Sequence, residues 1–327
     1  MARALDPEEA LALVRAYGRF SLSYSILQPG MEYFGEPGLG VIAYRRRMGQ
    51  CTVLGDPVVS EELRLALIEV FLDRFPNALF MQVHRETGEL LRPRGYHLTP
   101  VGVENEIQTS AFSLRGKQKA DLRHYRNRAL AGGVTVHEAC DTRALRLELK
   151  PVSDSWLPMK SWFHHELEFL ARPFVLEPEP DVRIFTARIG ARAVGFVVLD
   201  PIYESGKVMG YTVTILRHYP DAPEGTVDYI NLCVLETLRN DGVALLSLGV
   251  SPFHHIDETA REEGPGALPV YLLYRMLRRF GDPIYHFRGL SFHKSRYRAA
   301  EAPVYTAVRG RLGLLPVYAA SRACRML

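Results

Sequence analysis

The chain lacks the features of a membrane-spanning, exported or disulfide-rich protein. Its longest apolar stretches, such as 193–199 and 242–252, fall well short of the roughly 18 residues that span a bilayer. Residues 1–9 have neither a basic start nor an apolar run, so we expect no export signal and a cytoplasmic location. The four cysteines lie far apart without a C-x-x-C pair, which argues against a disulfide framework and a structural zinc site.

Several catalytic and cofactor motifs are also missing. There is no P-loop, no G-x-S-x-G and no H-E-x-x-H sequence. The pairs His164-His165 and His254-His255 are adjacent, and adjacent side chains on a helix point about 100° apart, which is a poor arrangement for one metal ion. We therefore expect no metal and no bound cofactor.

What the chain does have is a folded composition with unevenly distributed charge. Its 327 residues suggest about two domains, and 47% are hydrophobic. The net charge is only +3, but segments 115–128 and 288–327 are both strongly basic. Such basic surfaces suit a polyanionic partner. A simpler interpretation stays open, because nearly all basic residues are Arg and this preference can reflect codon usage.

The order of the expected elements repeats once. In the first half we expect a helix from Asp6 to Gly18, a hairpin over 40–45 and 51–54, a helix over 61–75 and a strand over 78–84. In the second half we expect a helix over 156–170, a hairpin over 182–189 and 193–199, a strand over 208–216, a helix to Arg239 that opens on a capping box of Asp221 and Glu224, and strands over 244–248 and 284–288. The sequence thus predicts a mixed α/β protein with two copies of one fold, residues 1–132 and 133–327, which meet near Gly132-Gly133.

A basic helix is expected between the halves, over 117–131. Lys119, Arg123 and Arg126 recur on one face, whereas Leu122 and Ala129 mark a face that can pack inward. A solvated charged face is the ordinary interpretation. Three cations without an interleaved acid repel one another, however, which favours an anionic partner.

The repeated order of strand, hairpin and helix is similar to the order of elements in the GNAT acyltransferases. That resemblance implies an acetyl-CoA pyrophosphate site at the turn over 218–226, before a helix. Only Gly225 is available there, and the usual Q/R-x-x-G-x-G/A run is absent. Use of acetyl-CoA is therefore disfavoured, although bare helix N–H groups can bind anions without glycine.

A series of short motifs, in order, resembles one known family over about 18–308. The motifs are Gly55-Asp56-Pro57-Val58, Phe112-Ser113-Leu114 with the basic helix, Ser153-Asp154 with Trp156-Leu157, Asp221-Ala222-Pro223 with Gly225-Thr226, Leu248-Gly249-Val250-Ser251-Pro252, and Phe287-Arg288-Gly289-Leu290 with 294–297. They resemble the soluble catalytic part of the phosphatidylglycerol lysyl- and alanyltransferases, the multiple peptide resistance factor family. The Fem-type peptidyltransferases are similar in plan.

The resemblance implies two tandem GNAT-like acyltransferase folds that move an amino acid from aminoacyl-tRNA to a hydroxyl or amine acceptor, such as phosphatidylglycerol, a related lipid or a small molecule. The catalytic residues it implies are Lys294, Arg217, Asp228 and Glu166, and the tRNA-binding residues are Lys119, Arg123, Arg126, Arg288 and Arg296. The sequence departs from the family pattern where Thr214 replaces a strand acid and His293 replaces Phe before Lys294. Thr214 cannot act as a carboxylate, which bears on recognition of a lysyl group.

Two other functions remain open from the sequence: an acetyl-CoA-dependent N-acetyltransferase and a non-catalytic RNA-binding module. The tail over 312–318 mixes apolar residues with nearby arginines, so it suits either peripheral contact with an anionic membrane or packing on the core.

Overall fold

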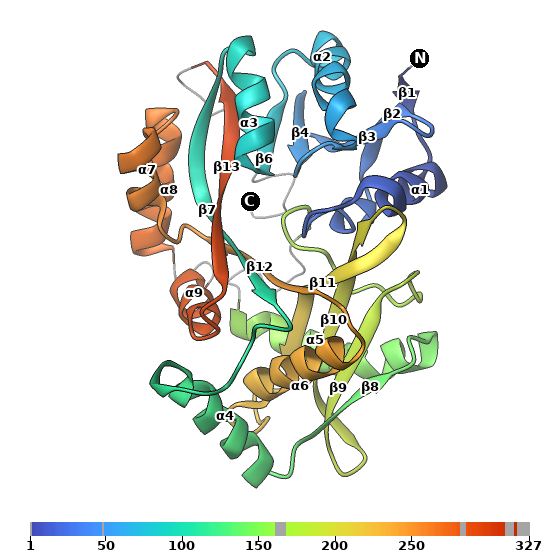
Figure 1. The fold of residues 1–327 in the computed structure, drawn as a ribbon, viewed down its shortest axis with the longest axis vertical. Helices are drawn as coiled ribbons and strands as arrows, with labels where there is room; N and C mark the ends of the chain where they lie inside the picture. The colour runs from blue at the N-terminus through green and yellow to red at the C-terminus, as the bar shows by residue number, and fades with distance from the viewer. Residues whose placement is uncertain (1, 48, 161–167, 282–285, 311–316, 319–327) are drawn as a thin grey trace.

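One mixed sheet of 13 strands runs through the described part of the protein (Figure 1). The computed structural model describes residues 2–47, 49–160, 168–281, 286–310 and 317–318. The strands are β1 (Arg3–Ala4), β2 (Glu32–Glu36), β3 (Gly40–Arg47), β4 (Gln50–Leu54), β5 (Val58–Val59), β6 (Leu79–Val83), β7 (Tyr96–Gln108), β8 (Thr135–Ala139), β9 (Arg183–Ile189), β10 (Arg192–Glu204), β11 (Lys207–His218), β12 (Leu245–Pro252) and β13 (Ala300–Arg309). Their order is β1-β2-β3-β4-β6-β13-β7-β12-β11-β10-β9-β8, with β5 paired to β3.

Nine α-helices lie in the described part of the chain. They are α1 (Pro7–Tyr17), α2 (Arg64–Arg74), α3 (Arg85–Leu91), α4 (Ala120–Ala131), α5 (Arg143–Lys160), α6 (Thr226–Asn240), α7 (Ile256–Glu263), α8 (Leu268–Phe280) and α9 (Phe287–Ser295). None of the described helices combines the length and the apolar character needed to cross a bilayer. The start of α1 follows directly from the sequence, because Asp6 and Glu9 form a complete capping box and Gly18 ends the helix.

The sheet contains two equivalent units, each built around one parallel crossover. Strand β4 runs through α2 to its parallel neighbour β6, and β11 runs through α6 to its parallel neighbour β12, while every other described pairing is antiparallel. In each parallel pair only three residues face each other before the strands diverge. The predicted fold class, mixed α/β with two tandem GNAT-like units, is confirmed.

The two units share strands instead of ending at a clean boundary. β13, the last of the described strands in sequence, lies between β6 and β7 of the first half, and β7 pairs with both β13 and β12. The sequence did not suggest a strand over 300–309. The division into 1–132 and 133–327 stays a prediction, since the sheet continues without a break from one half to the other.

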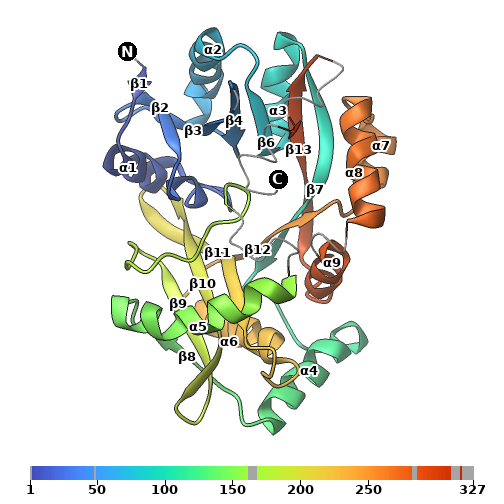
Figure 2. The same ribbon diagram turned by 180° about the vertical axis from the view of Figure 1, so that it is seen from behind.

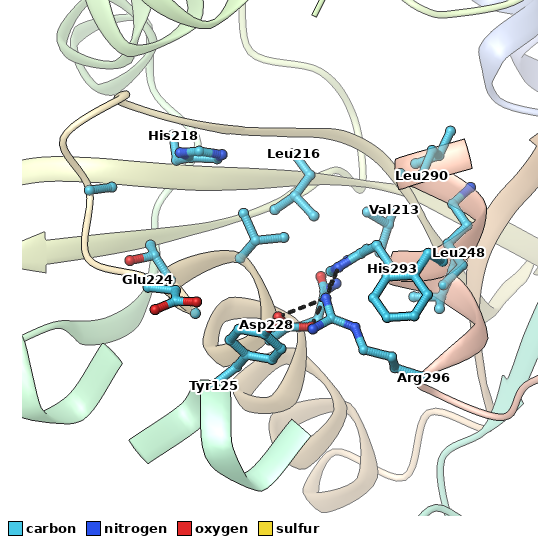
Figure 3. Close-up of a pocket in the computed structure, with 18 of the residues that line it drawn as sticks. Tyr125, Val213, Leu216, His218, Glu224, Asp228, Leu248, Leu290, His293 and Arg296 are labelled. Carbon is cyan, nitrogen blue, oxygen red and sulfur yellow. Dashed lines mark hydrogen bonds and ion pairs between the residues drawn. The ribbon is translucent and has the colours of Figure 1, made fainter. Parts of the chain in front are cut away.

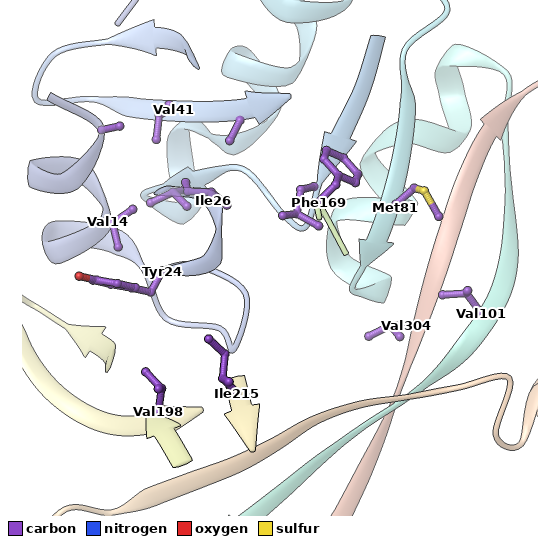
Figure 4. Close-up of a cluster of buried hydrophobic side chains, with 14 of the residues drawn as sticks. Val14, Tyr24, Ile26, Val41, Met81, Val101, Phe169, Val198, Ile215 and Val304 are labelled. Carbon is purple, nitrogen blue, oxygen red and sulfur yellow. The ribbon is translucent and has the colours of Figure 1, made fainter. Parts of the chain in front are cut away.

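Helices cover both faces of the sheet. In the second unit, α5 and α6 lie on opposite faces of β10 and β11, as the two views show (Figure 1 and Figure 2). One hydrophobic cluster joins the units, because it includes Val14 and Val41 from the first half and Val198 and Ile215 from the second (Figure 4). The halves therefore share this cluster, which is one of three in the core.

Three predicted elements differ in the structure. The helix expected over 156–170 begins earlier, at Arg143, and its predicted part over 161–167 lies outside the described residues. In the strand expected over 284–288, Phe287 and Arg288 instead open α9. The expected capping box of α6 is wrong: Gly225 is the N-cap, while Asp221 pairs with Arg192 and Glu224 with Arg128.

Candidate active site

A cavity of about 550 Å³ lies where β11 and β12 diverge (Figure 3). Thr214, Leu216 and His218, beyond the paired part of β11, line one side, and α6 and α9 supply much of the rest. Tyr125 of α4 and Trp156 of α5 complete the wall. Because parallel strands that part leave backbone groups without ladder partners, this is a natural place for polar side chains and ligands to enter a fold.

Lys294 of α9 reaches into this divergence. Its side chain is only 9% exposed, and its Nζ donates to the carbonyl oxygen of Val250 on β12 at 2.8 Å. Burial lowers the pKa of Lys294 to about 7, although the negative charge of Glu104 opposes the shift. An amine that titrates near neutral pH, at the wall of a cavity, has the properties of a reacting group.

A cluster of polar side chains surrounds Asp228 near the start of α6. Asp228 accepts hydrogen bonds from Arg296 and from the Tyr297 hydroxyl, both at 3.0 Å, and the Nδ1 of His293 lies 3.5 Å away (Figure 3). Burial raises the pKa of Asp228, against the opposing charge of Arg296. The guanidinium of Arg296 also stacks 4.5 Å from the centre of the Tyr125 ring. Arg296, predicted to contact tRNA, is therefore part of the cavity wall.

The buried polar atoms of this wall include one acceptor and one donor for which the described part of the protein shows no hydrogen-bond partner. They are Oδ1 of Asn231, an acceptor, and Nε of Arg296, a donor. A buried polar atom left without a partner costs about 1–3 kcal/mol. The pair therefore favours a ligand that carries both a donor and an acceptor.

Of the other two predicted catalytic residues, Arg217 does not line the cavity. Arg217 is buried on β11, donates to the Ser153 hydroxyl and stacks 5.3 Å from the Trp156 ring centre. Trp156 lines the cavity, whereas Arg217 itself does not. Glu166 lies outside the described residues.

The basic residues at the N-cap of α4 and along the helix are partly used inside the molecule. Lys119 donates to the backbone oxygen of Tyr297 and lies 4.6 Å from the Phe112 ring centre, and burial lowers its pKa. Arg123 donates to two backbone oxygens in the loop before the helix, at 2.5 and 2.7 Å. Arg126 contacts only its neighbour Asn127 through weak bonds of 3.3 and 3.4 Å among those described. The bond of Lys119 thus ties the start of α4 to the residues that follow α9, and the bonds of Arg123 hold the loop before α4.

Arg288, another predicted tRNA contact, lies on the far side of α9 from the cavity that Lys294 lines. It is exposed and donates to backbone oxygens at the end of α8, including that of Arg279 at 2.8 Å. The structure thus brings Lys294, Asp228 and Arg296 together and leaves Arg288 apart.

A buried ionic cluster that the sequence did not reveal connects the first unit to this site. His84 directs Nδ1 to Asp56 at 2.5 Å and Nε2 to Glu104 at 2.8 Å, and Glu104 accepts from the hydroxyl of Ser247 at 3.0 Å. Burial opposes a charge on His84, but the two carboxylates outweigh it and raise its pKa to about 11. Despite burial, His84 in turn lowers the pKa of Asp56 and of Glu104.

Only one member of this cluster carried a signal in the sequence. Asp56 belongs to the Gly55–Val58 motif, where we assigned it no role. His84 and Glu104 are ordinary strand-end and strand residues, separated by 20 positions, and only the pairing of β7 with β12 brings Glu104 opposite Val250.

The expectation that His254 and His255 point apart is wrong. The backbone of His255 is left-handed, with φ of 54°, so the pair precedes α7 instead of lying within it. The two rings lie 3.9 Å apart and both approach Glu301. Among the described residues these three form a group able to approach one ion.

Known proteins resemble this chain along most of its length. Residues 11–308 match the sequence family described as phosphatidylglycerol lysyltransferase, C-terminal. A phosphatidylglycerol lysyltransferase of Bacillus subtilis is 27% identical over 311 residues, 93% of this chain but 35% of that protein. One of Staphylococcus epidermidis is 23% identical over 296 residues, 88% of this chain and 34% of that protein. The chain thus spans about a third of the length of these relatives.

Among solved structures, L-PGS from Bacillus licheniformis superposes with a TM-score of 0.80 at 23% sequence identity. The match covers 98% of this chain and 97% of that one. At this identity the likeness establishes the fold.

The His84 cluster leads to a prediction about stability. His84→Gln should lower the free energy of unfolding by about 3 kcal/mol at pH 6, because it leaves two buried carboxylates without their cation. The unfolded imidazole loses its proton near pH 6.5 and the folded one near 11, so the contribution of wild-type His84 is full below pH 6.5 and declines above it. Urea unfolding from pH 6 to 9 measures both effects.

The matched control is His124→Gln, at an exposed position of α4. It should change neither the free energy of unfolding nor the dependence of that free energy on pH. If wild type and His84→Gln lose stability equally between pH 6.5 and 9, the charged cluster is not formed in solution.

Proposed function

The chain belongs to the family of phosphatidylglycerol lysyltransferase C-terminal domains, and we propose that it transfers an aminoacyl group from charged tRNA to a hydroxyl of phosphatidylglycerol or a related lipid. The observation that carries the proposal is Lys294, a buried amine with a pKa of about 7 at a cavity whose wall offers an unpaired donor and acceptor. An α-amino ester supplies the complementary groups.

In the proposed reaction the acceptor oxygen attacks the ester carbonyl carbon, and the bond from that carbon to the tRNA ribose oxygen then breaks. The acceptor proton ends on the ribose hydroxyl, so a new ester forms and no oxidant or reductant is needed. Negative charge develops on the carbonyl oxygen in between. Lys294, in its charged form, stabilises this oxyanion, and Asp228, which also accepts from the buried Tyr297 hydroxyl, fixes Arg296 in the cavity wall.

The position of α4 supports tRNA as the donor. The helix borders the cavity through Tyr125, and it also carries Arg123 and Arg126, with Lys119 at its N-cap. Phosphates that follow this face would deliver a single-stranded 3′ end to the cavity. Arg296 extends the positive charge from the helix to the cavity wall.

Contacts at the start of α6 argue against the acetyl-CoA alternative. A helix N-terminus after a central strand would have to stay open for the pyrophosphate. Here α4 approaches it so closely that a Cβ on Gly225 would lie 2.0 Å from the Tyr125 carbonyl oxygen. The close approach explains why glycine occupies this position, and the Tyr125 carbonyl oxygen takes the space on this side of the N-cap.

A transfer assay tests the proposal. The chain is given tRNA charged with a mixture of radiolabelled amino acids, together with vesicles containing phosphatidylglycerol. A mixture is needed because the described acids of the cavity wall, Asp228 and Glu224, are both ion-paired and identify no cationic amino acid. We expect label in the lipid fraction and no transfer from labelled acetyl-CoA. Binding of tRNA without transfer to a lipid or amine extract would instead support an RNA-binding module.

Substitution of Lys294 tests its role in the chemical step. Lys294→Met keeps the aliphatic stem and removes the charge, so turnover should fall about 10²-fold with little change in tRNA affinity. Lys294→Arg should recover part of the activity. Since Lys294 loses its proton near pH 7, the wild-type rate should decline as the pH rises through 7, and this decline should vanish in Lys294→Arg.

Lys207→Met, an exposed lysine at the start of β11, is the matched control and should behave like wild type. A raised Michaelis constant for tRNA at unchanged turnover in Lys294→Met would make Lys294 a binding residue.

The basic face of α4 gives a separate prediction about salt. Arg126→Ala should weaken tRNA binding and lower the slope of log affinity against log salt by about 0.7 to 0.9, as one lost phosphate contact does. Arg123→Ala should have the same effect and also reduce stability, because Arg123 holds the loop before α4. Arg239→Ala, exposed at the end of α6, is the control. Equal slopes for Arg126→Ala and Arg239→Ala would show that this face is ordinary solvated charge and does not contact tRNA phosphates.

A further inference from the structure

Helix α8 carries a stripe of large apolar side chains that no described part of the chain covers. The stripe consists of Leu268 (54% exposed), Leu272 (51%), Met276 (52%) and Phe280 (66%), at intervals of four residues. The opposite face holds the helix in place through buried Val270 and through Tyr274, whose hydroxyl is 2.8 Å from that of Thr306. The stripe is therefore a surface of a firmly packed helix at the edge of the molecule (Figure 1).

A positively charged cavity of about 540 Å³ adjoins this stripe. Its described lining includes four guanidinium groups and one carboxylate. The guanidinium groups belong to Arg275, Arg278, Arg279 and Arg288, and the carboxylate to Asp257. Asp257 is shared by Arg275 at 3.0 Å and Arg278 at 2.9 Å, so it offsets only part of the charge. On the helix, Arg275 and Arg279 follow one border of the apolar stripe.

We propose that α8 and this cavity dock the protein on an anionic phospholipid bilayer. The apolar stripe enters the boundary between headgroups and acyl chains, and the arginines contact lipid phosphates. An amphipathic helix with apolar residues on one side and arginines along the border has the pattern of interfacial membrane helices. A second copy of the chain fits this face poorly, because a symmetric contact would bring two such cationic cavities together.

The surface lies next to the catalytic cavity. Helix α9 separates the two cavities: Lys294 lines one, Arg288 lines the other, and Phe292, 63% exposed, lines both. A lipid headgroup held at Arg288 would thus be one helix away from the reacting amine. The purpose of the docking rests on the lipid acceptor of the proposed function. Binding to the bilayer itself requires neither the tRNA donor nor turnover.

Vesicle sedimentation without tRNA tests the docking. The wild-type chain should partition onto phosphatidylglycerol vesicles much more strongly than onto phosphatidylcholine vesicles. The double variant Leu272→Ser/Met276→Ser should lower that partition about tenfold or more, because two half-exposed apolar side chains no longer enter the bilayer. Arg279→Gln should lower it about fivefold at low salt, consistent with the loss of one basic residue at an anionic surface.

Matched controls use similar residues elsewhere. Leu65→Ser/Val70→Ser removes two equally exposed apolar side chains from α2, and Arg239→Gln removes an exposed cation from α6; both should bind like wild type. Unchanged binding of Leu272→Ser/Met276→Ser would overturn the proposal. If light scattering showed that this variant dissociates a wild-type dimer while vesicle binding persists, the stripe would be a subunit interface.

A parallel transfer assay with monomeric short-chain phosphatidylglycerol separates the two proposals. Vesicle binding without transfer would count against the proposed function alone, and transfer without vesicle binding would count against the docking surface alone.

Discussion

The parting of β11 and β12 after three paired residues is the constraint on which the rest of the site depends. Continued pairing would fill the space of the cavity with a regular ladder. Once the strands diverge, the oxygen of Val250 becomes available to the amine of Lys294. Gly249 has a positive φ of 72°, and a Cβ there would lie 3.7 Å from that amine. The same backbone irregularity therefore creates the cavity and holds the group that we propose reacts in it.

Strands β4 and β6 of the first unit diverge in the same way, but there an ion pair lies between the strand ends. Asp56 follows β4, His84 follows β6, and their ion pair bridges the two strand ends. From there the cluster reaches Glu104 on the shared strand β7 and Ser247 on β12, whose hydroxyl also accepts from the amide of Gly249. The first unit thus supports the second through a continuous polar path, and the charge of Glu104 acts on Lys294.

The sequence predicted what local patterns control. The capping box at Asp6, the expected hairpins and the periodicity of α4 and α6 gave elements close to those observed. What it did not predict depends on contacts distant in sequence. β13 is a strand because β6 and β7 leave room between them, and His84 is charged because two strands bring carboxylates to both ring nitrogens.

The residues of the candidate site also fall into those that the sequence identified and those whose contacts only the structure reveals. The motif around Lys294 and Arg296 was visible as a resemblance, and the structure places both residues at one cavity. That Lys119 and Arg123 bond to backbone oxygens, or that Arg288 borders a different cavity from Lys294, follows only from the packing of α4 and α9. Side-chain type and spacing identify a charged face, whereas the partners of each charge depend on the folded neighbours.

The most direct test of the central claim is a crystal structure with a non-hydrolysable aminoacyl-adenosine amide, a mimic of the charged tRNA end. The account predicts that its carbonyl oxygen lies about 3 Å from Nζ of Lys294, with its polar groups on Asn231 and Arg296. An analogue bound in this cavity with its carbonyl beyond reach of Lys294, or bound elsewhere on the molecule, would contradict the account.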